Sequence, residues 1–318
     1  MSLAFASRYL RCAGREIHFT DWPAASGVSP RGTVLAWHGL ARTGRDMDTL
    51  AAHLSSRGWR VVCPDTLGRG LSQWAVNPVD EYCMAFYARL ARELVDQLGL
   101  DNFHWVGTSM GGALGLVCAS GLLEPTLRPQ IASLLLNDNA PELAAPAIAR
   151  IKAYAGTPPA FDTVRQLEQF FRQTYQPYGW LSDAQWRHLT ETSARRLPNG
   201  QVTAHYDPAM ADQFTHHPHD YTTWHHWDAL DIPVLCLRGE HSDLVLRETT
   251  TRMLARGPGA RGLVSVIEVA GCGHAPALNV AQQWDWVAAF IEQHASFTLR
   301  SLPVPPARKG LGEHAAVS

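Results

Sequence analysis

The chain has 318 residues, of which 46% are hydrophobic and 18% are charged, and its formal net charge is −2. This length suits one large α/β domain or two smaller ones, and the composition is that of an ordinary globular protein. The near-neutral charge excludes a broad basic field for nucleic acid or anionic lipid. No window approaches the ~18 uninterrupted apolar residues of a membrane helix, so no membrane partner is expected.

The N-terminal residues and the cysteines favour a cytoplasmic protein. Residues 1–10 contain neither a basic segment nor a long apolar run, and we therefore expect no secretory signal. None of the six cysteines belongs to a Cys-x-x-Cys pair, and Cys63, Cys118 and Cys236 lie in apolar runs. Reduced thiols are expected in place of disulfides.

The elements before residue 120 alternate between strands and helices. Residues 4–21 alternate apolar and polar side chains around Ala13-Gly14, which predicts a β-hairpin. The remaining predictions, in chain order, are strand 33–38, helix 46–56, strand 60–65, loop 66–72, helix 81–98, strand 103–106 and helix 112–117.

Further strands are predicted at 131–136, 232–237 and 263–269, and an amphipathic helix covers 281–294. Strands that alternate with helices of this length imply an α/β fold whose mainly parallel sheet is covered on both faces. Functional groups in such sheets collect beyond the carboxyl ends of the strands.

One segment interrupts this alternation. Residues 138–231 show helical patterns but no convincing strand, and they contain 13 of the 29 aromatic residues. The segment is too long for a loop, so we predict a helical cap inserted into a core formed by residues 1–137 and 232–300. Residues 301–318 hold three prolines without periodicity and are predicted to be disordered.

The pentapeptide Gly107-Thr108-Ser109-Met110-Gly111 lies between a predicted strand and a predicted helix. Gly-x-Ser-x-Gly in this setting is typical of a nucleophile elbow, a tight strand-to-helix turn from which the serine hydroxyl projects alone. Gly107 and Gly111 let the strand and the helix approach each other. Ser109 is therefore the expected nucleophile.

A serine hydroxyl becomes a good nucleophile when a base takes its proton and a third group orients that base. His274, in a glycine-rich loop directly after strand 263–269, is the expected base. Asp243, in the loop after strand 232–237, is favoured as the orienting acid because that loop resembles the usual acid loop.

Two other acids remain open as alternatives. Asp138 directly follows strand 131–136, from which it can also reach the histidine, although it could instead cap the entry into the inserted segment. Glu240 is a weaker third candidate.

The oxyanion hole is expected to use the backbone N–H groups of Leu40 and Met110, since its second donor comes from the loop after the strand that ends in His38-Gly39. His38, Arg42 and Trp74 are candidate substrate-binding residues. For His38 we favour a role in orienting the loop by hydrogen bonds. Arg42 and Arg69 are expected to tie loops together through carboxylates more than to bind an acidic substrate group.

The histidine-rich stretch from His216 to Trp227 suggests a metal site at first sight. Structural zinc sites instead use regularly spaced cysteines and histidines, and adjacent histidines point in different directions. We interpret the stretch as a solvated cap segment, and no metal or other cofactor is expected.

Together these motifs resemble the α/β-hydrolase superfamily. The resemblance rests on the following ordered series: His38-Gly39, Asp65-x-x-Gly68-x-Gly70-x-Ser72, Gly107-x-Ser109-x-Gly111, Gly239-x-x-x-Asp243 and Gly273-His274. It implies an eight-stranded sheet and a serine-ester type of mechanism, but no particular substrate. Ser109 argues against haloalkane dehalogenases and epoxide hydrolases, which have an aspartate there, and Ala275 replaces the tryptophan usual in C–C hydrolases.

The leading hypothesis is a carboxylic ester hydrolase that acts on small, neutral, apolar esters through an acyl-enzyme. One alternative keeps the triad and cleaves a C–C or thioester bond. Another is a non-catalytic α/β-hydrolase that binds a small ligand. The sequence does not indicate an oligomeric state.

Overall fold

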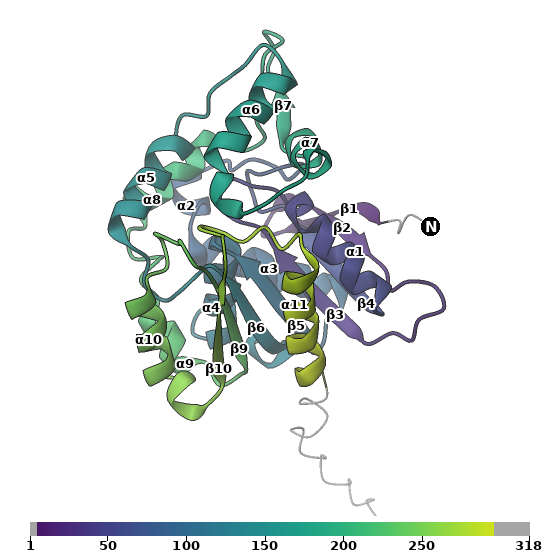
Figure 1. Ribbon diagram of the computed structural model, residues 1–318, viewed down its shortest axis with the longest axis vertical. Coiled ribbons are helices and arrows are strands. Elements are labelled where there is room, and N and C mark those ends of the chain that lie inside the picture. Colours follow the sequence, from purple (N-terminus) through teal and green to yellow (C-terminus); the bar gives the residue numbers. More distant parts are fainter. Residues whose placement is uncertain (1–4, 296–318) are drawn as a thin grey trace, which may run out of the picture.

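The computed structural model describes residues 5–295 and contains an eight-stranded sheet with helices on both faces (Figure 1). Across the sheet the strands run β1 (Ala6–Cys12), β2 (Arg15–Trp22), β4 (Trp59–Pro64), β3 (Gly32–Trp37), β5 (Phe103–Thr108), β6 (Ile131–Asn137), β9 (Val234–Gly239) and β10 (Val264–Val269). The β1–β2 and β2–β4 pairs are antiparallel, and the other pairs are parallel. The predicted eight-stranded, mainly parallel sheet is confirmed. The predicted tail at 301–318 lies outside the described residues.

Successive residues of the central strands pack into different layers, as a sheet covered on both faces requires. In β3, Leu35 and Trp37 join one buried cluster, whereas Val34 and Ala36 join the other. The first cluster includes residues of α3 (Met84–Leu98), α4 (Met110–Ser120) and α10 (Arg247–Ala255). The second includes residues of α1 (Asp48–Ser56) and α11 (Ala281–His294). The short helix α2 (Pro78–Glu81) precedes α3.

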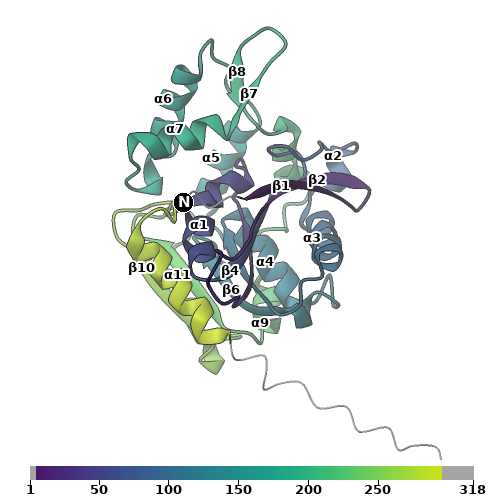
Figure 2. The ribbon, with the colours of Figure 1, turned by 90° about the vertical axis from the view of Figure 1, so that its right-hand side faces the viewer.

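The segment between β6 and β9 forms a layer above the sheet in Figures 1 and 2. Its helices are α5 (Ala145–Ala155), α6 (Val164–Thr174), α7 (Asp183–Glu191), α8 (Gln213–His216) and α9 (Trp224–Ala229). Of these, α9 lies lower, against α4. The layer is joined to the core by backbone bonds such as that from Gly70 N–H to the His205 carbonyl, at 2.9 Å.

The expectation that this segment contains no strand is wrong. A two-stranded antiparallel hairpin, β7 (Ala194–Arg196) and β8 (Val202–Ala204), projects from the cap (Figure 2). Each strand has only three residues, which is too short for an alternating pattern to be recognised. The turn between them contains Asn199-Gly200, with Gly200 at a φ of 88°.

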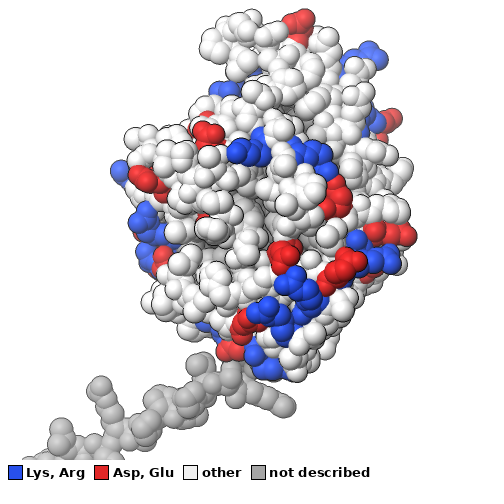
Figure 3. Space-filling model, turned by 90° about the vertical axis from the view of Figure 1, so that its left-hand side faces the viewer, with Lys and Arg blue, Asp and Glu red and all other residues white. Residues whose placement is uncertain are grey.

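Basic and acidic side chains are interspersed on the face that carries α9 and α10 (Figure 3). The ion pairs near these helices include Arg252–Glu142, Arg247–Glu268 and Arg256–Asp228. Within residues 5–295, no helix combines the length and the apolar character needed to cross a membrane. All six cysteines are buried and unpaired.

Candidate active site

Ser109 lies on a sharp turn between β5 and α4. Its backbone has φ 52° and ψ −117°, a conformation that side-chain-bearing residues rarely adopt and that functional sites retain. Cβ atoms could not be accommodated at either elbow glycine: at Gly107 one would lie 2.3 Å from the Gly111 carbonyl oxygen, and at Gly111 one would lie 2.3 Å from that of Trp37. The elbow therefore requires glycine on both sides of Ser109.

His274 extends from the loop after β10 to the serine. The Ser109 Oγ and His274 Nε2 atoms are 2.9 Å apart, and His274 Nδ1 is 2.7 Å from Asp138 Oδ2. A carboxylate accepts hydrogen bonds, so Nδ1 carries the proton and Nε2 of the neutral ring is free to accept the serine proton. This is the geometry of general-base activation.

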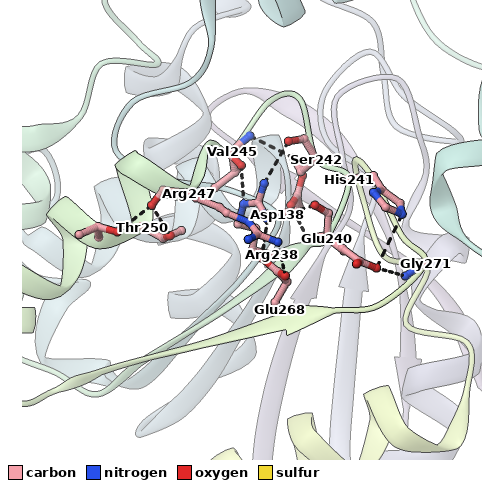
Figure 4. Close-up of polar contacts among 12 residues, drawn as sticks. Asp138, Arg238, Glu240, His241, Ser242, Val245, Arg247, Thr250, Glu268 and Gly271 are labelled. Carbon is pink, nitrogen blue, oxygen red and sulfur yellow. Dashed lines mark hydrogen bonds and ion pairs between the residues drawn. The ribbon is translucent and has the colours of Figure 1, made fainter.

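The Asp138 carboxylate is completely buried and is held by several donors. Its Oδ2 accepts the Ser242 hydroxyl at 2.6 Å (Figure 4). The same oxygen also accepts from His274 Nδ1, and Oδ1 accepts the Gly239 N–H at 2.8 Å. Hydrogen bonds to the ionised form offset the cost of burying the charge. Asp138 therefore has the partners that a buried, ionised orienting acid needs.

The prediction that Asp243 orients His274 is wrong. Asp243 forms an ion pair with Arg150 of α5, and both side chains are about half exposed, at 51% and 54%. The Arg150 guanidinium lowers the pKa of the Asp243 carboxyl, so that carboxylate is ionised and engaged elsewhere. Glu240 does not contact His274 either, because its carboxylate accepts the N–H of Gly271 (Figure 4).

Strand order explains why Asp138 takes this position. β6 lies beside β5, so Asp138 at the end of β6 is next to the elbow, whereas the β9 loop is one strand farther away. Within that β9 loop, Ser242 points toward Asp138, and the next residue, Asp243, points toward the cap. The loop thus contributes a hydroxyl to the buried network, and its carboxylate lies outside that network.

Sequence reasoning missed two residues that hold the site together. Ser242 holds Asp138, and Asn137 donates from Nδ2 to Thr108 Oγ1 at 3.0 Å and to the Pro276 carbonyl at 2.8 Å. Asn137 thereby fastens the histidine loop to the end of β5. Their only sequence signal is position, since each polar side chain lies at or just after the carboxyl end of a strand.

The loop after β3 lies against the elbow, as an oxyanion hole requires. A Cβ placed on Gly39 would lie 3.6 Å from the Ser109 Cβ. Among the described residues, the Leu40 N–H has no protein acceptor. Met110 is the first residue of α4, where an N–H has no intrahelical partner. Both donors are therefore available to a ligand.

Neither His38 nor Trp74 lines the cavity at Ser109, which corrects their assignment as substrate-binding residues. His38 is fully buried: its Nδ1–H donates to the Gly39 carbonyl at 2.6 Å, and its Nε2 accepts the Thr66 N–H at 2.9 Å. Trp74 stacks under the guanidinium of Arg195, at 4.6 Å. Both residues therefore have structural roles.

Arg42 does line the cavity, and two of its three guanidinium nitrogens are engaged within the protein, whereas the buried Nη1 has no hydrogen-bond partner among the described residues. Nε and Nη2 each donate to Asp46 at 2.7 Å, and Nη2 also donates to Ser193 Oγ of the cap at 2.8 Å. Arg42 therefore links the loop after β3 to the cap.

The buried histidines predict a loss of stability in mild acid. Burial lowers the pKa of His38 and of His104 to about 4, whereas an unfolded histidine titrates near ~6.5. Between these values the unfolded chain binds protons that the native protein does not. The free energy of unfolding should therefore decrease as the pH falls from 6.5 toward 4, by on the order of 1.4 kcal/mol per pH unit for each histidine.

Urea unfolding between pH 7 and 5, where most carboxylates stay ionised, measures this slope. His104 is remote from the cavity and bonds Ser133 Oγ at 2.8 Å, so His104→Asn is the variant of choice. His104→Asn should reduce the dependence of the free energy of unfolding on pH. A free energy of unfolding that does not change over this range would contradict the prediction.

A cavity of about 320 Å³ opens at Ser109 and His274 between the core and the cap. Its walls combine the aliphatic side chains of Leu143, Ile148 and Ile151 with the phenol of Tyr154 and the guanidinium of Arg150. The lining is therefore mixed. Among residues 5–295, no three His, Cys, Asp or Glu side chains are grouped as metal ligands.

Comparison with known proteins gives matches along most of the chain. The family described as "alpha/beta hydrolase fold" matches residues 32–279. A 3-hydroxybutyrate-oligomer hydrolase from Cupriavidus necator is 38% identical over 258 residues, which cover 78% of this chain and 84% of that protein.

Solved structures of similar fold also match most of the chain. An alpha/beta hydrolase from Novosphingobium aromaticivorans is 28% identical, with a TM-score of 0.76 over 92% of this chain and 99% of that one. An E-2-(acetamidomethylene)succinate hydrolase is 20% identical, with a TM-score of 0.75 over 91% of this chain and 100% of that one, and it supports the fold alone.

Proposed function

The chain is a hydrolase of the α/β-hydrolase family, and from this premise we propose that it cleaves carboxylic esters with Ser109 as nucleophile, His274 as base and Asp138 as orienting acid. The observation that carries the proposal is the continuous hydrogen-bonded relay from Ser109 Oγ through His274 to Asp138. It supplies the three roles that acyl transfer to a serine needs.

In the first half-reaction, Ser109 Oγ attacks the ester carbonyl carbon while its proton moves to His274 Nε2. The carbonyl π electrons become an oxyanion, which the N–H groups of Leu40 and Met110 stabilise. Collapse of this intermediate breaks the C–O bond to the alcohol. His274 gives its proton to the leaving alkoxide, and the acyl group stays on Ser109.

In the second half-reaction, His274 takes a proton from water, whose oxygen attacks the acyl-enzyme. A second oxyanion forms in the same hole and collapses to release the carboxylic acid, and the proton returns to Ser109 Oγ. Asp138 stays ionised throughout and stabilises the imidazolium of each half-reaction.

For the substrate, we propose short oligomers of 3-hydroxybutyrate. The cavity is at the small end of the ~300–1,000 Å³ of small-molecule sites, which favours a short ester over a long acyl chain. Burial raises the pKa of the Tyr154 and Tyr178 phenols, so both stay protonated and can donate to ester carbonyls. The relative from Cupriavidus necator is named for hydrolysis of such oligomers.

This proposal replaces the expected neutral, apolar ester with a more oxygen-rich one. A wholly apolar ester would leave the Tyr154 and Tyr178 phenols of the lining without partners. An ester oligomer presents repeated carbonyl acceptors to these donors and methyl groups to the aliphatic wall around Ile148.

The test is a comparison of kcat/KM for 3-hydroxybutyrate dimer and trimer with that for simple alkyl esters of matched length. We expect at least about a tenfold preference for the oligomers, of the order that one or two hydrogen-bonded contacts confer. Tyr154→Phe keeps the ring and removes the donor, so it should narrow this preference. A preference for long, unsubstituted acyl chains would contradict the substrate proposal and leave the ester chemistry intact.

A further inference from the structure

Arg69 is a fully buried arginine in the loop after β4. Its Nε donates to the Leu40 carbonyl at 2.9 Å, and its Nη2 lies 3.6 Å from the Met110 sulfur. The other terminal nitrogen, Nη1, donates to the Leu67 carbonyl at 2.6 Å and to the Tyr87 hydroxyl at 2.8 Å. One guanidinium thus contacts both residues whose N–H groups form the proposed oxyanion hole.

The charge of Arg69 is not balanced by a carboxylate. Its polar contacts within residues 5–295 are carbonyl oxygens, a hydroxyl and a sulfur, contrary to the expected tie through carboxylates such as Asp65. Burial raises the pKa of the Tyr87 phenol, so this hydrogen-bond partner of Arg69 is neutral. Tyr82, whose ring lies 5.5 Å from the guanidinium carbon, donates its hydroxyl to Asp207.

Burying a guanidinium without a carboxylate is costly, because neutral dipoles replace only part of the hydration of the ion. A purely structural tie between loops could use a neutral donor at lower cost. The place where an uncompensated positive charge is useful is next to a developing negative charge in a site shielded from water.

We propose that Arg69 is a positioning residue for the oxyanion hole. Its Nε bond fixes the Leu40 peptide, its Nη2 contact fixes the Met110 side chain, and its charge adds positive potential where the oxyanion develops. The inference rests on the proposed ester hydrolysis, since it assigns a role in that reaction. Arg69 does not line the cavity, so it acts through its contacts with these two residues and through the electrostatic field of its charge.

The loop that carries Arg69 is also held by the cap. Gly70 N–H donates to the His205 carbonyl at 2.9 Å, and Asp207 N–H donates to the Gly68 carbonyl at 2.7 Å. These bonds flank Arg69 on both sides. The cap therefore contributes to the position of the guanidinium, and through it to the oxyanion hole.

Two variants separate the charge from the geometry. Arg69→Met removes both, and we expect kcat to fall by about 100-fold, comparable to the loss of one oxyanion-hole donor. Arg69→Lys keeps the charge but lacks the fork that contacts Leu40 and Met110 together, and we expect a smaller loss of about tenfold. KM should change little in both variants, because the oxyanion exists only in the transition state and the intermediates.

A second readout distinguishes this role from a structural one. A trifluoromethyl ketone forms an adduct with Ser109 that carries an oxyanion, whereas the corresponding secondary alcohol forms no adduct and carries no charge. Arg69→Met should weaken binding of the ketone by about the same factor as kcat and leave binding of the alcohol unchanged.

Tyr87→Phe is the matched control, because it removes one hydrogen bond from the same guanidinium and leaves the bond to Leu40 in place. It should keep kcat within about twofold of the wild type and lower the thermal stability only by the loss of this one hydrogen bond. A folded Arg69→Met or Arg69→Lys protein with wild-type kcat, or one whose loss lies only in KM, would overturn the proposal.

If Arg69→Met does not fold, Arg69→Lys and the ketone affinity still decide the question. Failure of the proposed function gives a different result, namely turnover that survives Ser109→Ala. Loss of turnover in Ser109→Ala together with full activity in both Arg69 variants would overturn this inference alone.

Discussion

Replacing Asp138 with asparagine should lower kcat by about 10⁴-fold, as expected when a triad histidine loses its orienting carboxylate. The Asp138 oxygens accept from Gly239 N–H, the Ser242 hydroxyl and His274 Nδ1. An asparagine has only one acceptor oxygen, so its NH₂ group must face at least one of these donors. If it faces Nδ1, the ring holds its proton on Nε2 and cannot accept one from Ser109.

Asp243→Asn is the matched control, because it removes a carboxylate from the neighbouring loop. Its ion pair with Arg150 is about half exposed, and such pairs contribute only ~0–1 kcal/mol. We therefore expect kcat within about tenfold of the wild type. Steady-state kinetics on one ester, with thermal unfolding of each variant, decide the matter. The reverse ranking of the two variants would show that Asp243 orients His274 during turnover.

Replacing Ser109 with alanine should have the largest effect of any single substitution, a loss of about 10⁶-fold in kcat. Without Oγ no acyl-enzyme forms, and only the oxyanion hole and substrate binding remain. The elbow should survive the change to a residue that still carries a Cβ, so substrate binding should be retained. Product formation over several days, compared with a no-enzyme blank, measures the remaining activity.

Residual turnover within about 100-fold of the wild type would contradict the assignment of Ser109, since it would require another nucleophile or direct attack by water. His274→Gln is the companion variant. It removes the base and leaves the hydroxyl, and it should lose a similar factor because residues that act as a unit are not additive.

The parts of the site that local sequence determines could be predicted. The elbow needs glycines at 107 and 111 whatever the rest of the chain does, and the glycine-rich loop around His274 follows a strand directly. The strand and helix alternation likewise implied a parallel sheet with its functional groups at the carboxyl ends.

The choice of acid could not be predicted, because it depends on which side chain of a loop points inward. Ser242 and Asp243 are adjacent, and only the folded loop directs one to Asp138 and the other to Arg150. Asp138 itself has a φ of 50°, and no local sequence motif predicts this backbone conformation.

The proposed role of Arg69 could not be predicted from the sequence for a related reason. Its loop was expected to be tied by carboxylates, but the guanidinium instead meets the Leu40 carbonyl and the Tyr87 hydroxyl. These partners come from distant parts of the chain and are ordinary core residues in the sequence. Only tertiary packing brings them together around the buried charge.

The central claim is that esters are cleaved through a covalent intermediate on Ser109. The most direct measurement is mass spectrometry of the protein after acid quenching during turnover of an ester, followed by identification of the modified peptide. We predict one acyl group on the peptide that contains Ser109, and none in Ser109→Ala. Turnover by the wild type with no acyl adduct, or an adduct on a different residue, would contradict it.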